Sequence, residues 1–229
     1  MKEQVSVNAQ YNVARSGSLP IRIAEHQRRK MFQAFLNTMD PDGADTILDV
    51  GVTSDRSYNH SNYLELWYPH KSQVTACGLD DASFLELEYP GMRFVRADGR
   101  NLPFDDCSHD FVHSSAVLEH VGNRDNQIKF VSELWRVARR GIFVTTPNRW
   151  FPVEFHTLSP LIHWFPPSIF RAIMRRTGRA FFAREENLNL LGSRNVKDIA
   201  AAAGMTSPQV ANVTIGMWPT NLLLVGHKS

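Results

Sequence analysis

Ile47-Leu48-Asp49-Val50-Gly51 is the stretch that decides the fold, because an apolar run of β-type residues ends there in a carboxylate and a glycine. Two later apolar runs end in the same way, at Gly78-Leu79-Asp80-Asp81 and at Ala97-Asp98. In a doubly wound α/β sheet, ligands bind at the carboxyl ends of the strands, where these acidic groups would meet. Carboxylates along one edge suit a nucleoside-bearing ligand, with one near its amino-acid or phosphate end, one near the ribose and one near the base.

The elements around this stretch alternate between strands and helices. Helical spacing of apolar residues predicts helices over residues 20–38, 125–138 and 194–204. Apolar runs predict strands at residues 46–50, 73–79, 92–96, 109–113, 141–146, 208–215 and 221–226. Repeated strand–helix units predict an α/β fold with a Rossmann-like, doubly wound and mainly parallel seven-stranded sheet. Residues 216–220 are too few for a parallel crossover, so the last strand is expected to be antiparallel.

The whole chain, residues 1–229, is expected to form one domain. Residues 1–43 form an N-terminal helical segment, and residues 44–146 form the core that carries the acidic edge. Residues 147–192 are rich in proline and aromatic side chains and interrupt the alternation, which predicts a cap inserted over the sheet edge. Residues 193–229 would then complete the fold with a helix and a hairpin.

Composition and charge narrow the possible environment and partners. The net charge of +2 and the isoelectric point near 8.6 argue against a strong preference for nucleic acid. Two cysteines, Cys77 and Cys107, cannot form a disulfide framework and suggest a reducing compartment. Residues 1–6 lack the apolar core of a signal peptide, and no apolar run approaches the length of a spanning helix. We therefore expect a cytoplasmic protein.

Two further motifs accompany the first acidic run. Asp98-Gly99 is followed by Leu102-Pro103-Phe104, and residues 110–121 read Asp-Phe-Val-His-Ser-Ser-Ala-Val-Leu-Glu-His-Val. With these motifs in this order, the chain resembles the class I S-adenosylmethionine-dependent methyltransferases of the small-molecule type, such as those of quinone biosynthesis. The family's first strand ends in an Asp-x-Gly-x-Gly-x-Gly loop. Asp49 and Gly51 match it, whereas Thr53 and Asp55 occupy the positions of the later glycines.

The resemblance implies S-adenosyl-L-methionine as cofactor and assigns residues to its parts. It implies that Asp80 accepts hydrogen bonds from both ribose hydroxyls, that Asp81 lies along the adenine, and that Asp98 takes the adenine amino group. Thr53 and Ser54 would supply hydroxyls where relatives use bare backbone, or would only cap the next helix. The complete expected cofactor set is Asp49, Gly51, Thr53, Ser54, Asp80, Asp81, Asp98, Gly99 and Ser114.

Residues 145–157 leave the fifth strand over the same edge and carry polar groups among aromatic side chains, as in a small-molecule pocket. Asn148 and Arg149, with His120 from residues 110–121, are the expected acceptor contacts. His156 is the expected catalytic base because imidazole titrates near neutrality, and Glu154 is expected to orient it. His120 and its neighbour Glu119 have an alternative reading as a structural pair.

No metal is expected, because no pair of histidines or cysteines shows the tight spacing of a zinc site. In residues 160–182, large apolar side chains are interleaved with arginines. Such a stretch can rest on an anionic bilayer or receive a lipid-linked acceptor. The favoured alternative is a cap helix that packs on its own domain. The sequence leaves the oligomeric state open.

The expected activity is methyl transfer from S-adenosylmethionine to a small-molecule or glycan-type acceptor, on oxygen. One alternative is a nicotinamide-dependent oxidoreductase, which is weakened because the Gly-x-Gly-x-x-Gly turn is missing. A second alternative is a catalytically inactive cofactor-binding protein of the same fold, suggested by the missing glycines of the first loop.

Overall fold

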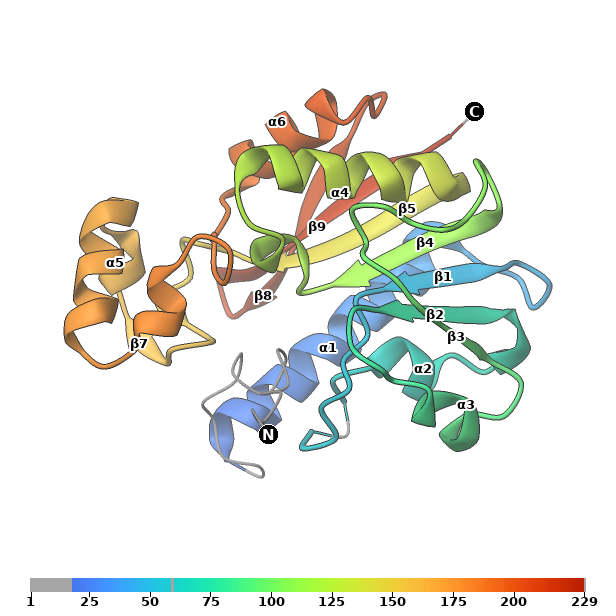
Figure 1. Cartoon of the computed structure of the whole chain (residues 1–229), viewed down its shortest axis with the longest axis horizontal. Helices are drawn as coiled ribbons and strands as arrows, with labels where there is room; N and C mark the ends of the chain where they lie inside the picture. Colours follow the sequence, from blue (N-terminus) through green and yellow to red (C-terminus); the bar gives the residue numbers. More distant parts are fainter. Residues whose placement is uncertain (1–17, 59, 229) are drawn as a thin grey trace, which may run out of the picture.

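A computed structural model describes residues 18–58 and 60–228, so residues 1–17 of the expected N-terminal segment lie outside the described part. The described chain folds around one seven-stranded sheet (Figure 1). Across the sheet, the strands are β3 (Arg93–Arg96), β2 (Val74–Gly78), β1 (Ile47–Val50), β4 (His109–Ser115), β5 (Ala138–Pro147), β9 (Trp218–His227) and β8 (Gln209–Ile215).

Strands β1 to β5 pair in parallel, whereas β9 runs antiparallel to both β5 and β8. This arrangement confirms the expected Rossmann-like sheet and its antiparallel last strand. It also places β9 between β5 and β8, so that β8 forms the outer edge of the sheet.

Helices cover both faces of the sheet, and each face has its own apolar core. On one face lie α4 (Arg124–Val137) and α6 (Ser193–Ala202). On the other face lie α1 (Leu19–Met39), α2 (Tyr63–Trp67) and α3 (Phe84–Glu88). The strands of parallel sheets read as continuous apolar runs because both of their faces are covered in this way. The remaining helical turns are 3-10 segments at Lys71–Gln73, Leu118–His120, Ile162–Trp164 and Ala180–Ala183.

The sequence of α4 shows why such a helix forms and where it packs. Asn123 precedes the helix, and its side chain accepts a hydrogen bond from the backbone N–H of Asn126, 3.0 Å away. This N-cap satisfies one of the amide groups that the first turn leaves without a helical partner. Phe130, Leu134 and Val137 recur at helical spacing and are fully buried against the sheet.

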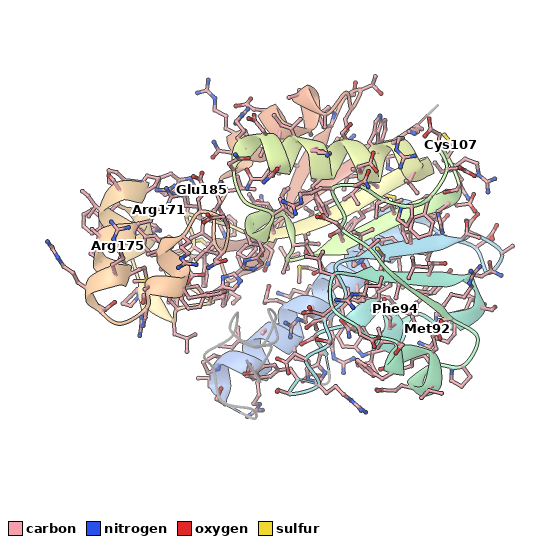
Figure 2. All side chains as sticks on the ribbon, viewed as in Figure 1. Met92, Phe94, Cys107, Arg171, Arg175 and Glu185 are labelled. Atoms are coloured by element: carbon pink, nitrogen blue, oxygen red, sulfur yellow. The ribbon has the colours of Figure 1, made fainter. Side chains whose placement is uncertain are left out.

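The segment after β5 forms a cap that extends beyond the end of the sheet, at the left of Figure 1. It contains the short hairpin of β6 (Val153–Glu154) and β7 (Ser159–Pro160), followed by α5 (Pro167–Arg176). The cap has a small apolar core of its own, made of Phe170, Met174, Phe182, Ala183 and Leu188. In Figure 2, Arg171 of α5 lies near Glu185, and the two side chains form an ion pair of 3.6 Å.

One side of α5 therefore packs within the cap, as the favoured sequence alternative expects. Leu161, Phe165 and Ile169 nevertheless remain about half exposed, at 47%, 50% and 46%. Contact of this surface with a membrane or a lipid-linked acceptor remains a prediction. None of the helices in the described part of the chain is long and apolar enough to span a bilayer. Cys77 and Cys107 are both free thiols.

Candidate active site

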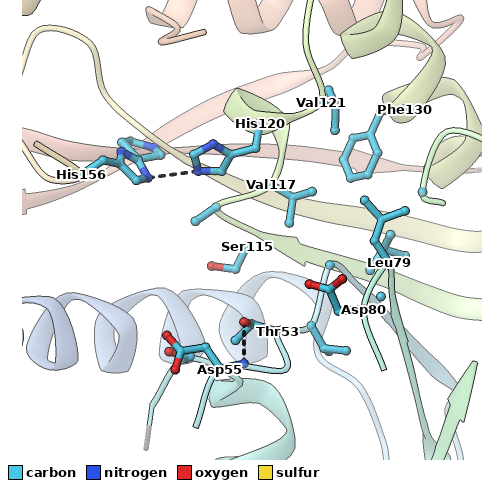
Figure 3. A pocket seen from close by; sticks show the side chains of 18 of the residues that line it. Thr53, Asp55, Leu79, Asp80, Ser115, Val117, His120, Val121, Phe130 and His156 are labelled. Atoms are coloured by element: carbon cyan, nitrogen blue, oxygen red, sulfur yellow. Dashed lines mark hydrogen bonds between the residues drawn. The ribbon is translucent and has the colours of Figure 1, made fainter. Parts of the chain in front are cut away.

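A cavity of about 520 Å³ opens where the carboxyl ends of β1, β2, β3 and β4 meet α1 and the cap (Figure 3). The expected ligand-binding edge therefore carries a cavity large enough for a small-molecule ligand. Several of the predicted site residues line it, namely Gly51, Thr53, Asp80, Asp98, Gly99, His120 and His156.

Gly51 makes the turn out of β1 possible. Its φ of +105° lies in the region that favours glycine, and an added Cβ would come within 2.1 Å of Cγ2 of Val117. Its backbone N–H donates to the carbonyl of Cys77 at 2.7 Å, which ties the turn to the end of β2. A side chain at this position would therefore push the loop away from the floor of the cavity.

Side chains hold the rest of this loop in place of the missing glycines. The Asn62 side chain accepts a bond from the Thr53 backbone N–H and donates one to the Thr53 carbonyl, each at 2.9 Å. The Thr53 hydroxyl in turn accepts the Asp55 N–H at 3.0 Å, as Figure 3 shows. Ser54 lies outside the cavity lining. The loop thus has a defined shape, and Thr53 and Asp55 both reach the cavity from it.

The acidic residues after β2 and β3 differ in their surroundings. Asp80 lies in the cavity lining, whereas Asp81 is exposed and accepts the Ser83 N–H at 2.9 Å, just before α3. That hydrogen bond lowers the pKa of Asp81. Asp98 lines the cavity but is held by Arg100, whose Nη2 lies 2.6 Å from Oδ2. The hydrogen bonds from Arg100 lower the pKa of Asp98.

Asp49 and Ser114 lie inside strands and outside the cavity lining. Successive side chains of a strand point to opposite faces, so Ser115 lines the cavity, while Ser114 donates to the carbonyl of Val50 at 2.7 Å. The Asp49 carboxylate lies 2.7 Å from Nδ1 of His113. Burial raises the pKa of Asp49 to about 7 and that of its buried neighbour Glu65 well above its ordinary value.

At the cap end of the cavity, His156 lines the wall and pairs with Glu154, which is buried behind it. The Glu154 carboxylate lies 2.7 Å from Nδ1 of His156 and also accepts the backbone N–H groups of His156 and Thr157. Burial alone would raise the pKa of Glu154, but the charge of His156 and these hydrogen bonds bring it down to about 2. Burial alone would lower the pKa of His156, but Glu154 raises it.

His120 faces His156 across this end of the cavity, and their Nε2 atoms lie 3.1 Å apart (Figure 3). Nδ1 of His120 lies 2.6 Å from the carbonyl of Asn187, and burial with the charge of His156 lowers its pKa to about 3. Glu119 lies fully buried beside it and accepts the Thr146 hydroxyl at 2.8 Å. Burial raises the pKa of Glu119. The structure thus joins His120, His156 and Glu154 in one cluster.

Asn148 and Arg149 lie outside the cavity lining, at the base of the cap. The Asn148 side chain donates to the carbonyl of Pro219 at 3.0 Å, and the Asn148 backbone N–H donates to the carbonyl of Thr220. The Arg149 guanidinium donates to the carbonyl of Phe165 at 2.9 Å. Asn148 thus ties the start of the cap to the first residues of β9, and Arg149 ties it to a later part of the cap. Both side chains therefore stabilise the cap where it leaves the sheet.

Two polar side chains of α1 that the sequence motifs did not predict, Gln27 and Arg28, also line the cavity. Gln27 Nε2 and Arg28 Nη1 are buried and have no hydrogen-bond partner among the residues that the structure describes. Burial lowers the pKa of Arg28. Their position in the helix could have indicated this role. Gln27 is buried on the same side of α1 as the apolar residues Ile21 and Met31, and polar residues are uncommon on the buried side of a helix that only packs against a core.

Comparison with known proteins agrees with this geometry. The sequence of residues 48–145 matches a family described as a methyltransferase domain, and this match spans β1 to β5 with the loops that form the cofactor edge of the cavity. Residues 48–145 are thus a methyltransferase domain, and the enzyme is an S-adenosylmethionine-dependent methyltransferase. Its cofactor is S-adenosyl-L-methionine. No protein of curated function matches the methyltransferase in sequence.

Solved structures share the fold of this methyltransferase at low sequence identity. A possible histamine N-methyltransferase from Thermotoga maritima is 13% identical over 92% of each chain, with a TM-score of 0.57. Magnesium protoporphyrin IX methyltransferase from Synechocystis, solved with bound S-adenosylhomocysteine (SAH), is 15% identical over 92% of this chain and 86% of its own, with a TM-score of 0.55. The CurJ carbon methyltransferase is 10% identical over 88% of this chain and 53% of its own, with a TM-score of 0.57. The fold therefore serves more than one type of methyl acceptor.

Proposed function

We propose that this methyltransferase methylates a hydroxyl oxygen of a small-molecule or glycan-type acceptor that binds between the sheet edge and the cap. The observation that carries the proposal is the pair of buried Glu154 and cavity-lining His156, with 2.7 Å between the carboxylate and Nδ1 of the imidazole. A hydroxyl must lose its proton when it is methylated, and a carboxylate-oriented imidazole is suited to accept it.

The edge of the cavity at the strand ends suits the cofactor. When bound, S-adenosylmethionine supplies an activated methyl group on its sulfonium sulfur. We assign Asp80 to the ribose hydroxyls, because a carboxylate can accept two hydrogen bonds at once. Thr53 and Ser115 would face the methionine end from the first and fourth strand ends, and Asp98 and Gly99 would lie near the adenine. The buried amide of Gln27 and guanidinium of Arg28 can donate to a carboxylate in the same cavity.

The cap end suits an acceptor with polar and apolar parts. Phe155 and Leu158 line it beside the two histidines, and Asn187 and Asn221 add amide groups. Glu154 fixes the tautomer of His156 by accepting its Nδ1–H, so that Nε2 is the atom that takes the hydroxyl proton. The remaining task of the protein is to align the acceptor oxygen with the methyl carbon and to exclude water.

Replacement of His156 tests this role. We expect His156→Ala to leave SAH affinity nearly unchanged and to slow methyl transfer by about 10²–10⁴-fold, the range for a lost general base. Transfer can be followed with a panel of hydroxylated acceptors and S-adenosylmethionine labelled in its methyl group. His163→Gln is the matched control, because His163 is a buried cap histidine that bonds the carbonyl of Phe151 and lies outside the cavity lining.

Two outcomes would contradict the proposal. Full activity of both His156→Ala and His156→Gln would reduce His156 to a packing residue. Near-normal turnover in His156→Gln with loss in His156→Ala would show that His156 only positions the acceptor, since glutamine cannot take the proton at neutral pH. Titration of the wild-type protein with SAH and with NAD separates this function from the nicotinamide-dependent alternative. SAH binding without transfer to any acceptor would favour the inactive alternative.

A further inference from the structure

At the cap end of the cavity, Glu119, His120 and His156 each offer one possible metal-ligand atom, and these three atoms lie within 4.8 Å of one another. We propose that Glu119, His120 and His156 together bind a divalent transition metal ion, with Zn²⁺ as the ion that best fits two imidazoles and a carboxylate.

The spacing of the three atoms suits such an ion. The two Nε2 atoms lie 3.1 Å apart, and Oε1 of Glu119 lies 3.8 Å from Nε2 of His120. With zinc–nitrogen bonds of about 2.0–2.1 Å, two ligands at a tetrahedral angle lie roughly 3.3 Å apart. Small side-chain adjustments would therefore bring all three atoms into the coordination shell.

The second polar atom of each proposed ligand side chain lies at hydrogen-bond distance from another group of the protein. Nδ1 of His120 lies 2.6 Å from the carbonyl of Asn187, and Nδ1 of His156 lies 2.7 Å from the carboxylate of Glu154. Oε2 of Glu119 accepts the hydroxyl of Thr146 at 2.8 Å. Metal-binding histidines are typically oriented by such outer contacts to a carbonyl or carboxylate, which fix the tautomer and the orientation of the ring.

The short distance between the two Nε2 atoms could also reflect a proton shared between the imidazoles of His120 and His156, but a metal ion accounts for Glu119 as well. The proton would satisfy both Nε2 atoms, but it would not reach Oε1 of Glu119. That oxygen is buried and has no hydrogen-bond partner among the residues that the structure describes. A buried carboxylate oxygen without a partner is costly. A cation among the three side chains would satisfy all of them at once.

The proposed site also leaves room for a further ligand. Three protein ligands leave one tetrahedral position open, which is the pattern of catalytic rather than structural zinc sites. Because His120 and His156 line the cavity, an acceptor hydroxyl can occupy that position. This part of the inference rests on the proposed function. It keeps the proposed methylation of a hydroxyl but replaces the proposed base: the ion would lower the pKa of the hydroxyl, whose proton would leave to solvent, and His156 would be a metal ligand.

The transfer itself balances without another reactant. The acceptor oxygen would form a bond to the methyl carbon while the carbon–sulfur bond of the cofactor would break, with the bonding electrons left on sulfur. The products are the methylated acceptor, SAH and the proton already released. No oxidation or reduction takes place, so an ion without redox chemistry such as Zn²⁺ is sufficient.

Direct metal binding tests the site without any assay of activity. Tag-free protein is stripped with a chelator, checked for folding by circular dichroism, and titrated with Zn²⁺ in a calorimeter. Co²⁺ then serves as a spectroscopic probe of tetrahedral nitrogen and oxygen ligands. We expect one ion per chain, loss of the cobalt spectrum in His120→Asn, and about 10–100-fold weaker Zn²⁺ binding in Thr146→Val, which removes only an outer contact.

Glu119→Gln keeps the shape of the side chain and removes its charge, so it should also weaken binding if the variant remains folded. His26→Asn is the matched control, because His26 is an exposed histidine of α1 outside the cavity. Absence of stoichiometric binding in the folded wild-type protein would overturn the metal site, as would equal binding in all these variants. Zn²⁺ binding without methyl transfer to hydroxylated acceptors would instead overturn only the proposed function. Chelator-resistant methyl transfer that still depends on His156 would overturn the metal's role and leave His156 as base.

Discussion

Asp49 and His113 lie opposite each other on the neighbouring strands β1 and β4, and the Asp49 carboxylate is 2.7 Å from Nδ1 of His113. The other ring nitrogen, Nε2, lies 2.9 Å from the Tyr63 hydroxyl. The His113 ring packs against Phe35 and Phe143 in the core between the sheet and α1. The first acidic residue of the family motif thus holds two strands together inside the protein.

Asp49→Ala should therefore act mainly on stability. It leaves a buried imidazole N–H without its acceptor, and we expect the free energy of unfolding to fall by about 1–3 kcal/mol. Urea denaturation followed by tryptophan fluorescence measures this change. Asp80→Ala is the matched comparison, because Asp80 lines the cavity, and it should change stability less. Unchanged stability with abolished SAH binding in Asp49→Ala would place Asp49 in the cofactor site after all.

Asp80 and Asp81 provide a second matched pair, since they are adjacent but only Asp80 lines the cavity. Loss of a charged acceptor typically costs about 1.5–3 kcal/mol, so Asp80→Ala should weaken SAH binding by about 10–100-fold. Asp81→Ala should have a much smaller effect, because its carboxylate bonds the backbone of Ser83. Calorimetry with SAH gives both affinities. Equal losses in the two variants would assign Asp81 to the adenine, as the family resemblance implies.

The first loop can be tested at its hydroxyls. We expect the double variant Thr53→Val, Ser54→Ala to bind SAH measurably more weakly, with the loss arising from Thr53, which lines the cavity. The single variants, titrated in parallel, separate the two contributions. If the double variant binds normally, the hydroxyls only shape the loop, and the methionine end of the cofactor is held by other groups.

Asn62 should matter to the same loop although its bonds go to backbone. Its amide spans Thr53 with two hydrogen bonds of 2.9 Å, one to the N–H and one to the carbonyl. Asn62→Leu removes both bonds while it keeps a side chain of similar size. We expect weaker SAH binding and faster hydrogen exchange in the loop. Normal affinity together with normal exchange would show that the loop keeps its shape without this clamp.

The surface of the cap offers a test of the predicted membrane contact. Phe165 and Ile169 are about half exposed, at 50% and 46%, and Arg175 and Arg176 of α5 are exposed as well. If this surface rests on an anionic bilayer, Phe165→Ser, Ile169→Ser should reduce co-sedimentation with phosphatidylserine-containing vesicles, and wild-type binding should weaken with added salt. Met217→Ser, at the exposed turn between β8 and β9, is the control. No difference between wild-type protein and the double variant would leave α5 as a packing element of the cap.

Much of the sheet could be predicted from the sequence because both faces of its parallel strands are covered. The observed β1, Ile47–Val50, and β2, Val74–Gly78, lie within the predicted runs of residues 46–50 and 73–79. The short connection before β9 correctly indicated an antiparallel strand. The orientation of Asp49 was less accessible, because a motif match does not show on which face of a strand a side chain lies.

The cap end of the site illustrates what sequence patterns do not contain. His120 and His156 are 36 residues apart in the chain, and only the path of the cap brings their rings together. Metal-site patterns rely on close spacing along one element, so the motifs did not group His156 with the adjacent residues Glu119 and His120. Gln27 and Arg28 were missed for a different reason: the motifs begin at Ile47, after α1 has ended at Met39, and they do not indicate that α1 reaches the cavity.

The position of β9 between β5 and β8 has a consequence for how the sheet comes apart. Strand β8 is paired in the sheet with β9, so β9 cannot leave the sheet without taking β8 with it. When they detach, β5 becomes an edge strand whose unpaired backbone groups can recruit another chain. Partial unfolding at this end would therefore expose a new sheet edge that can start aggregation while strands β1 to β4 stay paired.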